Sequence, residues 1–263
     1  MAESMIAGLL RQNLIEAEQI SGSHPRESRR RELEDRYGIR TFESNAGAAA
    51  SIRDTPGASV VITVKPQRMS RVLGDLKGSV AHDGLVISIV AGASIERISA
   101  ELGTAHVVRA MPNTPSQIGA GITAWTCSEA VSDSERARVR QLLTALGKDL
   151  YVETENMIDM ATSLSATGPT YIFMVMEALT DAGVHLGFSR DIARELVQET
   201  MLGSVKFAME SHKHPAELRN MVTSPGGTSA EAIYQMEKGT LRTVLSKAVY
   251  AAYKRAGELG GKD

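Results

Sequence analysis

The segment Thr223–Ser229 (TSPGGTS) has the residue types of a site that holds a small anion. Gly226 and Gly227 free the backbone to present several N–H groups, and the flanking hydroxyls can donate as well. A helix is predicted from Ser229, and its N-terminal dipole favours a carboxylate at this point. A flexible linker between helices is the alternative, but it has no need of this density of hydroxyls. We therefore favour an anion-binding loop.

A second candidate site follows two buried-type strands. The run Ala58–Val64 stops at Lys65 and Pro66, and the run Leu85–Val90 stops at Ala91–Gly92. Ligands collect at the carboxyl ends of strands in open α/β sheets, so Lys65 would lie where a cofactor passes. The small residues of Ala91–Gly92 would let a ligand approach the backbone closely. From these residues alone, a solvated lysine before a helix-starting proline is an equally good interpretation.

Other polar clusters favour ordinary structure. His212 and His214 (SHKHP) lack a Cys or carboxylate at ligand spacing, so we predict surface residues and no metal site. Cys127 is predicted to be a packed thiol. The segment Arg109–Gly121 (RAMPNTPSQIGAG) is predicted to be a stiff polar turn after a strand, and Arg29–Arg31 a solvated helix face.

The elements that must position these residues alternate through the first half of the chain, which is typical of an α/β fold with a doubly wound parallel sheet. The predicted strands are Glu18–Ser21, Arg40–Phe42, Ala58–Val64, Leu85–Val90, Val107–Met111, Ile122–Thr126 and Leu150–Val152. The predicted helices are Met1–Leu10, Pro25–Tyr37, Asn45–Ile52, Pro66–Leu76, Ile95–Leu102 with Ser94 as its N-cap, and Asp133–Leu146.

After residue 153 only helical spacing remains, so we expect two domains, 1–153 and 154–263. The predicted helices of the second domain are Ser163–Leu186, Ser189–Ser211, Pro215–Met221, Ser229–Lys238 and Leu241–Leu259. The first of them is apolar around much of its circumference, at Ile172, Val175, Met176 and Leu179. Burial against a partner chain and an ordinary core explain that pattern equally well.

Composition excludes several classes of function. The 263 residues carry 29 Lys and Arg against 31 Asp and Glu, a formal charge of −2, which leaves no basic excess for nucleic acid. No apolar run approaches the roughly 20 residues of a membrane-spanning helix, and no signal segment begins the chain. The single cysteine suits a reducing compartment. We expect a soluble cytoplasmic protein.

Several motifs together resemble one family, pyrroline-5-carboxylate reductase, from Met1 to about Glu258. In order they are MAESMIAGLL, Asn45, VKPQ, SIVAG, RAMPNTP, LSATGPTY at Leu164–Tyr171, and HPAELRNMVTSPGGTSAEAI at His214–Ile233. The resemblance implies a Rossmann-like NAD(P)-binding domain followed by an all-α dimerisation domain, and thus a homodimer that is often assembled further. It also implies hydride transfer from NADPH to 1-pyrroline-5-carboxylate, which forms L-proline in the last step of proline biosynthesis.

The resemblance assigns cofactor-binding and substrate-binding residues. Those expected to line the dinucleotide are Asn45, Val64, Lys65, Pro66, Ala91 and Gly92, with Ser23 and Arg26 near the adenosine 2′ position. No acidic residue ends the strand at Ser23, and Arg26 favours a 2′-phosphate, so NADPH is expected, with NADH possible. The expected substrate-binding residues are Glu155, Ser224, Gly226, Gly227, Thr228 and Ser229. Ser229 is the catalytic candidate, because its hydroxyl can position or relay the proton that the imine nitrogen gains.

The chain departs from the family in three places. Ala166 and Thr167 stand where the family usually has Gly-Ser, and Ser229 replaces a usual threonine. The first strand and the Gly-rich loop that holds the pyrophosphate are absent, since Gly8 and Gly22 form no G-x-G-x-x-G. Losing that strand would expose its neighbours and remove the phosphate cradle. We therefore expect either a start placed too far downstream or a chain cut at that point, and a natural protein roughly ten residues longer. Its intact mass would test this.

Two other hypotheses remain open. A non-catalytic paralogue acting as a regulatory or binding dimer predicts no NADPH binding, although the intact Thr223–Ser229 loop argues against it. A reductase of another cyclic imine would keep the cofactor site and change the ring pocket. Turnover on five- and six-membered ring imines separates that enzyme from the first.

Overall fold

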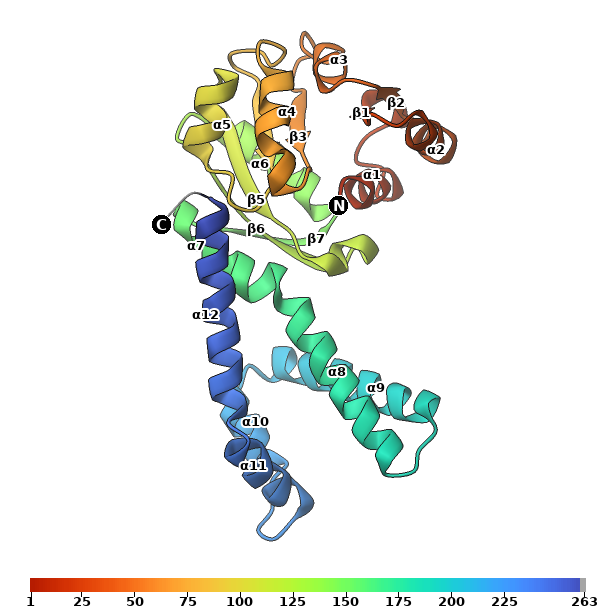
Figure 1. Ribbon diagram of the computed structural model, residues 1–263, viewed down its shortest axis with the longest axis vertical. Coiled ribbons are helices and arrows are strands. Elements are labelled where there is room, and N and C mark those ends of the chain that lie inside the picture. Colours follow the sequence, from red (N-terminus) through yellow and green to blue (C-terminus); the bar gives the residue numbers. More distant parts are fainter. Residues whose placement is uncertain (261–263) are drawn as a thin grey trace. The chain divides into compact units, whose positions relative to one another are not determined.

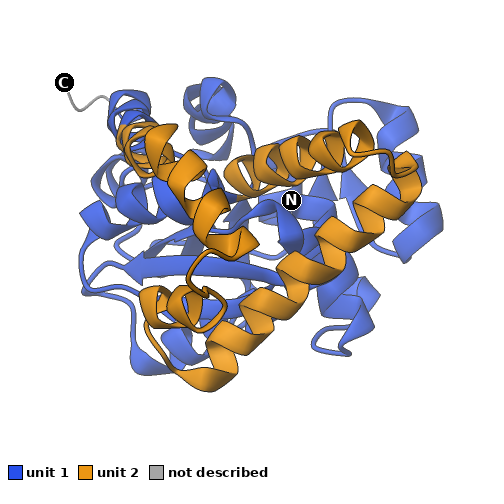
Figure 2. Cartoon of the chain, turned by 90° about the horizontal axis from the view of Figure 1, so that it is seen from below, with its two compact units in different colours: residues 1–168, 251–263 blue, residues 169–250 orange. Residues whose placement is uncertain are grey.

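The computed structural model describes residues 1–260 and divides into two compact units (Figure 2). The first unit holds residues 1–168 with the C-terminal residues from 251 onward, and the second holds residues 169–250. All strands of the described chain lie in the first unit, and the second is helical. The division that we expect from the sequence, between residues 153 and 154, differs from these units and stays a prediction.

The larger sheet of the first unit has the strand order β3-β4-β5-β6-β7 (Figure 1). Its strands are β3 (Ser59–Ile62), β4 (Leu85–Ser88), β5 (Val107–Met111), β6 (Gly121–Cys127) and β7 (Gly147–Tyr151). The sheet is the predicted doubly wound one with mostly parallel strands, and only the neighbours β5 and β6 pair antiparallel. Only a short loop with a 3-10 turn at Thr114–Ile118 joins those two strands, whereas a parallel crossover needs a dozen or more residues.

A separate two-stranded parallel sheet contains β1 (Ser21–Ser23) and β2 (Arg40–Phe42). The strand predicted at Glu18–Ser21 is wrong in position, because Ala17–Gln19 forms a 3-10 turn before β1. Within the described residues no strand joins β1 to β3, so each of them has an unpaired edge. The described strands therefore form two separate sheets.

Helices cover both faces of the larger sheet, as a doubly wound fold requires. Helices α4 (Met69–Leu76) and α5 (Ile95–Leu102) share one core cluster with Val86 and Val107. Helices α1 (Ala2–Arg11) and α6 (Asp133–Thr144) share the opposite cluster with Ile87 and Val108. Successive residues of a strand point to opposite faces, so Val86 of β4 joins one core cluster while Leu85 and Ile87 join the other.

Side-chain caps begin the helices α5 and α6 of the first unit. The hydroxyl of Ser94 accepts the N–H of Arg97, as predicted for the N-cap of α5. At the start of α6, Ser132 and Glu135 form a reciprocal capping box. Beside the small sheet lie α2 (Glu27–Tyr37) and α3 (Asn45–Ala50), each at or near its predicted place.

The described residues after β7 are helical. The helices are α7 (Glu155–Ala161), a π turn at Thr162–Ala166, α8 (Gly168–His185), α9 (Arg190–Ser211), α10 (Pro215–Met221), α11 (Thr228–Lys238) and α12 (Leu241–Leu259). The prediction missed α7 and placed a single helix from Ser163, where the π turn separates α7 from α8. The other four helices lie within a residue of their predictions.

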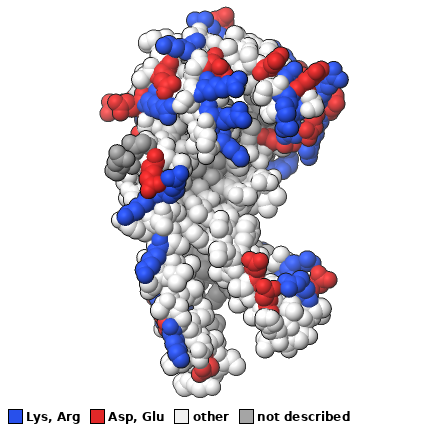
Figure 3. Space-filling model, viewed as in Figure 1, with Lys and Arg blue, Asp and Glu red and all other residues white. Residues whose placement is uncertain are grey.

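Two of the four apolar residues named on α8 are exposed within the single chain, and the other two, Val175 and Met176, are half-buried. Ile172 is 50 % exposed and Leu179 is 48 % exposed, so an ordinary core does not explain them. On the face shown in Figure 3, charged side chains crowd the first unit, while much of the helical unit's surface is uncharged. Burial against a partner chain is the interpretation that remains.

The two histidines of the SHKHP segment and the single cysteine have structural roles. His214 caps α10, where its Nδ1 accepts the N–H of Ala216, and His212 adopts a left-handed backbone conformation after α9. Cys127 is half-buried, and this burial raises the pKa of its thiol. Among residues 1–260 no helix is long and apolar enough to cross a membrane. The same residues contain no group of three or more His, Cys, Asp and Glu side chains placed to hold a metal ion.

Candidate functional site

The carboxyl ends of β3 and β4 lead to Val64, Lys65 and Ala91–Gly92 at one edge of the sheet. The two strands are parallel and in register from Ser59 opposite Leu85, so the segments that follow them leave the sheet on the same side. Lys65 is exposed and immediately precedes the 3-10 turn Pro66–Arg68, in which Pro66 takes the first position. The structure thus places these predicted cofactor residues at the edge where nucleotides bind in such sheets.

Gly92 has a specific structural reason to be glycine. Its φ is +75°, and a Cβ there would lie 2.5 Å from the carbonyl carbon of Leu259 and 2.6 Å from the nitrogen of Gly260. The close approach that the sequence suggests for a ligand is therefore made by the chain's own C-terminal helix. Ala91 remains at the edge of the sheet where the cofactor is predicted to bind.

At the end of β1, the structure brings Ser23 and Asn45 together. The hydroxyl of Ser23 donates to Oδ1 of Asn45 over 2.7 Å, and Nδ2 of Asn45 donates to the Asp75 carboxylate over 3.0 Å. This chain of hydrogen bonds links the small sheet to α4. It fixes two predicted cofactor residues that lie 22 positions apart in the sequence.

Hydrogen bonds that the sequence did not predict hold the loop that carries Arg26. The backbone N–H of Arg26 donates to Nδ1 of His24 over 3.1 Å, and Nη1 of Arg30 donates to the carbonyls of His24 and Pro25. Arg29 pairs with Glu3 and Glu32, so the prediction of a merely solvated Arg29–Arg31 face holds only for Arg31. Arg26 itself is exposed at the start of α2.

A buried ion-pair network lies where β5 meets α7. Arg109 is 1 % exposed, and its guanidinium contacts Glu155 at 3.0 Å and Asp159 at 2.5 Å. Glu155 also accepts the N–H of Ile95 at the start of α5 over 2.9 Å. Glu155, expected near the substrate, therefore holds α5, α7 and β5 together within the first unit. The missed signal is an arginine inside the apolar run VVRAM.

The predicted substrate loop forms the entry to α11 in the second unit. Gly226 has φ +70°, and the N–H of Gly227 donates to the carbonyl of Ser224 over 3.0 Å. A Cβ at Gly227 would lie 2.5 Å from the hydroxyl oxygen of Ser224, which would have to turn away, and the positive φ of Gly226 favours glycine there. The helix begins at Thr228, and its first N–H groups have no partner within the helix. The structure thus brings together five of the predicted substrate residues in one turn, Ser224, Gly226, Gly227, Thr228 and Ser229, while Glu155 lies in the other unit.

Two family models match this chain, and their boundaries differ from those of the two compact units. A family model described as "NADP oxidoreductase coenzyme F420-dependent" matches residues 1–92, and one described as "Pyrroline-5-carboxylate reductase dimerisation" matches residues 155–259. Fold and matches together define a nicotinamide-dependent oxidoreductase with a Rossmann-like domain and a helical dimerisation domain. More narrowly, the chain belongs to the pyrroline-5-carboxylate reductase family.

The similarity extends over the whole chain. A pyrroline-5-carboxylate reductase from Synechocystis sp. is 38 % identical over 262 residues, which are 100 % of this chain and 96 % of the relative. Among solved structures, the reductase from Coxiella burnetii is 34 % identical with a TM-score of 0.86, covering 98 % of this chain and 94 % of that one. The Plasmodium falciparum pyrroline carboxylate reductase, solved with NADP bound, is 27 % identical with a TM-score of 0.88 and the same coverage.

Proposed function

We propose that this chain reduces 1-pyrroline-5-carboxylate to L-proline with NADPH, the last step of proline biosynthesis. The observation that carries the proposal is the whole-chain identity of 38 % to a reductase of that name. The glycine-dependent turn at Ser224–Ser229 adds a site suited to the substrate's carboxylate. The lone Cys127 suits the cytoplasm as the place of this reaction.

The described residues fit NADPH at two points. Ser23, Asn45 and exposed Arg26 form a polar, cationic end to β1, which suits the adenosine 2′-phosphate. Val64, Lys65, Pro66 and Ala91–Gly92 provide the sheet edge along which the rest of the dinucleotide would lie. No glycine-rich phosphate turn lies among residues 1–260 between a strand and α1. NADH is the weaker candidate, because Arg26 has no role toward a free 2′-hydroxyl.

Bound NADPH would supply the hydride for the C=N carbon, and the protein would supply orientation and a proton. We assign the carboxylate of the substrate to the N–H groups that begin α11 and to the hydroxyls of Ser224 and Thr228. The hydroxyl of Ser229 is assigned to the ring nitrogen, where it would position or relay the incoming proton.

The working form is proposed to be a homodimer, with higher assembly possible. The dimerisation match covers residues 155–259, and the second unit leaves large apolar side chains exposed on several helices. Monomers rarely expose apolar surface of that extent without a partner.

Oxidation of NADPH in the presence of 1-pyrroline-5-carboxylate tests the proposal. We expect turnover with the five-membered ring and much weaker turnover with the six-membered ring imine. Equal turnover on both would favour the reductase of another cyclic imine. If titration of cofactor fluorescence detects no NADPH binding to a folded chain, the non-catalytic paralogue becomes the better hypothesis.

A further inference from the structure

A cavity lies in the first unit, away from the carboxyl ends of β3 and β4. It has a volume of about 370 Å³ and is formed by the loop of residues 51–58, the loop of residues 77–84 and the start of α6. Ala58 and Gly84 immediately precede β3 and β4, so the cavity opens at the amino ends of these parallel strands. Lys65 and Ala91 follow the carboxyl ends. The two sites therefore lie at opposite edges of the sheet.

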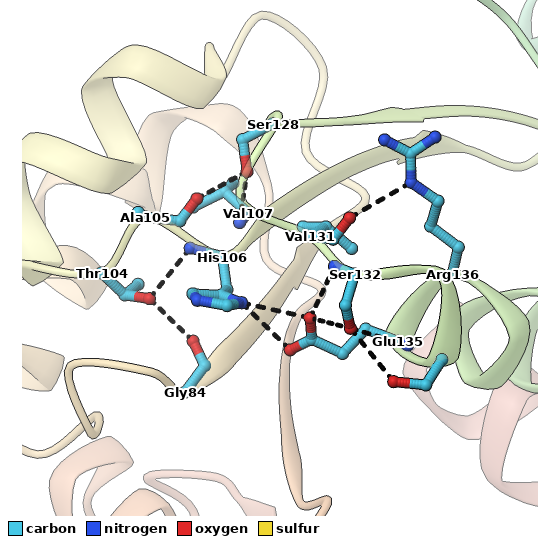
Figure 4. A network of polar contacts seen from close by, with 11 residues as sticks. Gly84, Thr104, Ala105, His106, Val107, Ser128, Val131, Ser132, Glu135 and Arg136 are labelled. Carbon is cyan, nitrogen blue, oxygen red and sulfur yellow. Dashed lines mark hydrogen bonds and ion pairs between the residues drawn. The ribbon is translucent and has the colours of Figure 1, made fainter.

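Charged side chains of both signs surround this cavity. Arg53 and Arg138 face it together with Asp54, Asp83 and Glu135. Glu135 is already engaged, because it accepts the N–H and hydroxyl of Ser132 and lies 3.1 Å from Nδ1 of His106 (Figure 4). No ion pair among residues 1–260 uses the other four charged groups.

Arg138 is the group that most needs a partner. Its Nε is buried and has no hydrogen-bond partner among the described residues. A buried donor left unsatisfied costs about 1–3 kcal/mol. The guanidinium packs over Gly57, where a Cβ would collide with Nη1 and where φ is +76°. This packing holds the planar fork in place, and a planar fork matches a carboxylate.

The remaining walls suit a small molecule that carries both charges. Val60, Val80 and Leu85 supply apolar surface, and the carboxylates of Asp54 and Asp83 can accept an ammonium group. Two arginines against three carboxylates leave the cavity without a positive excess, which disfavours phosphate and other multivalent anions. The volume lies at the lower end of the range for small-molecule sites.

From these observations we propose that the cavity binds a zwitterionic α-amino acid with a small apolar side chain. Its carboxylate pairs with Arg138 and its ammonium group with Asp54 or Asp83. Because the cavity lies opposite the nucleotide edge, this ligand does not compete with NADPH for its residues. The proposal stands independently of the reductase activity.

Equilibrium dialysis with radiolabelled L-valine and L-proline tests this site. L-Valine is not a product of the proposed reaction, so its binding reports on the cavity alone. We expect both amino acids to bind the intact wild-type protein and to bind Arg138→Gln about tenfold or more weakly, since one charged hydrogen bond of about 1.5 kcal/mol is worth about that factor. Arg140→Gln is the matched control, because Arg140 lies on the same helix but pairs with Asp149.

Two further variants and two competitors test whether the amino acid binds in this cavity. Asp83→Asn removes a charge from an exposed loop and should also weaken binding if Arg138→Gln does not fold. Ser229→Ala should leave L-valine binding unchanged, and a loss there would place the ligand at the substrate loop. Unlabelled acetate and methylammonium should each compete poorly; competition equal to that of L-valine would mean a simple ion site. Absence of binding to the wild type, or equal binding to Arg138→Gln and Arg140→Gln, would overturn the proposal.

Discussion

Arg109 has a permanently charged side chain that is buried in the first unit. Its side chain is 2 % exposed, and its partner Asp159 is 4 % exposed. Such a pair adds little stability relative to apolar residues, but removal of Asp159 leaves the buried guanidinium with only the more exposed Glu155 as its ion-pair partner. Nε of Arg109 already has no hydrogen-bond partner among the described residues.

Asp159→Asn should therefore lower the free energy of unfolding by about 3 kcal/mol, even though the side chains have almost the same volume. Urea denaturation followed by circular dichroism measures this change. Arg31→Gln is the control: it breaks an exposed pair with Glu27, in which both side chains are more than half exposed. That variant should change the free energy by less than about 0.5 kcal/mol. Equal effects of the two variants would contradict the role given to burial.

At the cofactor edge, Arg26→Ala should raise the KM for NADPH about tenfold, because it removes one charge-assisted hydrogen bond to the 2′-phosphate. The KM for NADH should change little, since NADH lacks that phosphate. Steady-state kinetics with both cofactors measures the ratio. Arg31→Ala, on the same helix, should leave the ratio at its wild-type value. An equal rise for NADH would assign Arg26 to another part of the nucleotide.

Within the substrate loop, Ser229→Ala should lower kcat about a hundredfold, because proton transfer by a positioned group contributes about that much. Ser229→Thr should retain most of the turnover, since it keeps the hydroxyl. Single-turnover measurements at saturating substrate separate this step from binding. Wild-type kcat in Ser229→Ala would remove Ser229 from the chemistry.

At the scale of elements, the carboxylate of Glu3 on α1 binds side chains of α2. Glu3 accepts hydrogen bonds from Arg29, Arg36 and Tyr37. The hydrogen bonds from Arg29 and Tyr37, with the charges of Arg29 and Arg36, hold the pKa of Glu3 below its ordinary value of 4.5, although burial acts to raise it. Because α1 otherwise packs on α6 and the larger sheet, this cluster links the small sheet's helix to the main core.

The lowered pKa of Glu3 determines how its contribution to folding stability changes with pH. A carboxylate with a lowered folded-state pKa stabilises the protein above its unfolded pKa, and the stabilisation is lost as the pH falls through the folded value. Glu3→Gln should be less stable than wild type by about 1 kcal/mol at neutral pH. The difference in unfolding free energy between the two proteins should narrow below about pH 4.5 and disappear in stronger acid.

Urea denaturation of both proteins at neutral and acidic pH measures this difference. Glu27→Gln is the control, since Glu27 makes an exposed pair with Arg31 on the outside of α2. A difference for Glu3→Gln that stays constant with pH would mean that Glu3 contributes through packing rather than charge.

At the scale of the whole molecule, the exposed apolar residues of the helical unit imply a subunit interface. Phe173 on α8 is 57 % exposed, whereas Ile118 is a comparably exposed apolar residue of the sheet unit at 76 %. Phe173→Asp should weaken dimerisation at least about tenfold, because it places a charge in a surface that a partner would desolvate. Ile118→Asp should leave it unchanged. Sedimentation equilibrium measures both, and equal behaviour of the two variants would contradict an interface on α8.

The sequence alone determined the strand–helix alternation, the helical second half, the Ser94 cap and the turn at Ser224–Ser229. These features depend on neighbouring residues, through apolar periodicity, capping chemistry and glycine pairs, so one chain carries enough information. The antiparallel direction of β6 also has a local cause in its short connection, which the strand pattern alone did not reveal.

Other features needed the tertiary structure, because they join groups far apart in the chain. Arg109 meets Asp159 across 50 positions, and the backbone at Leu259 explains why Gly92 has no side chain. The cavity beside Arg138 combines three separate segments. Periodicity shows which side of an element is buried, but not what lies against it. Only packing in three dimensions decides which charge meets which partner.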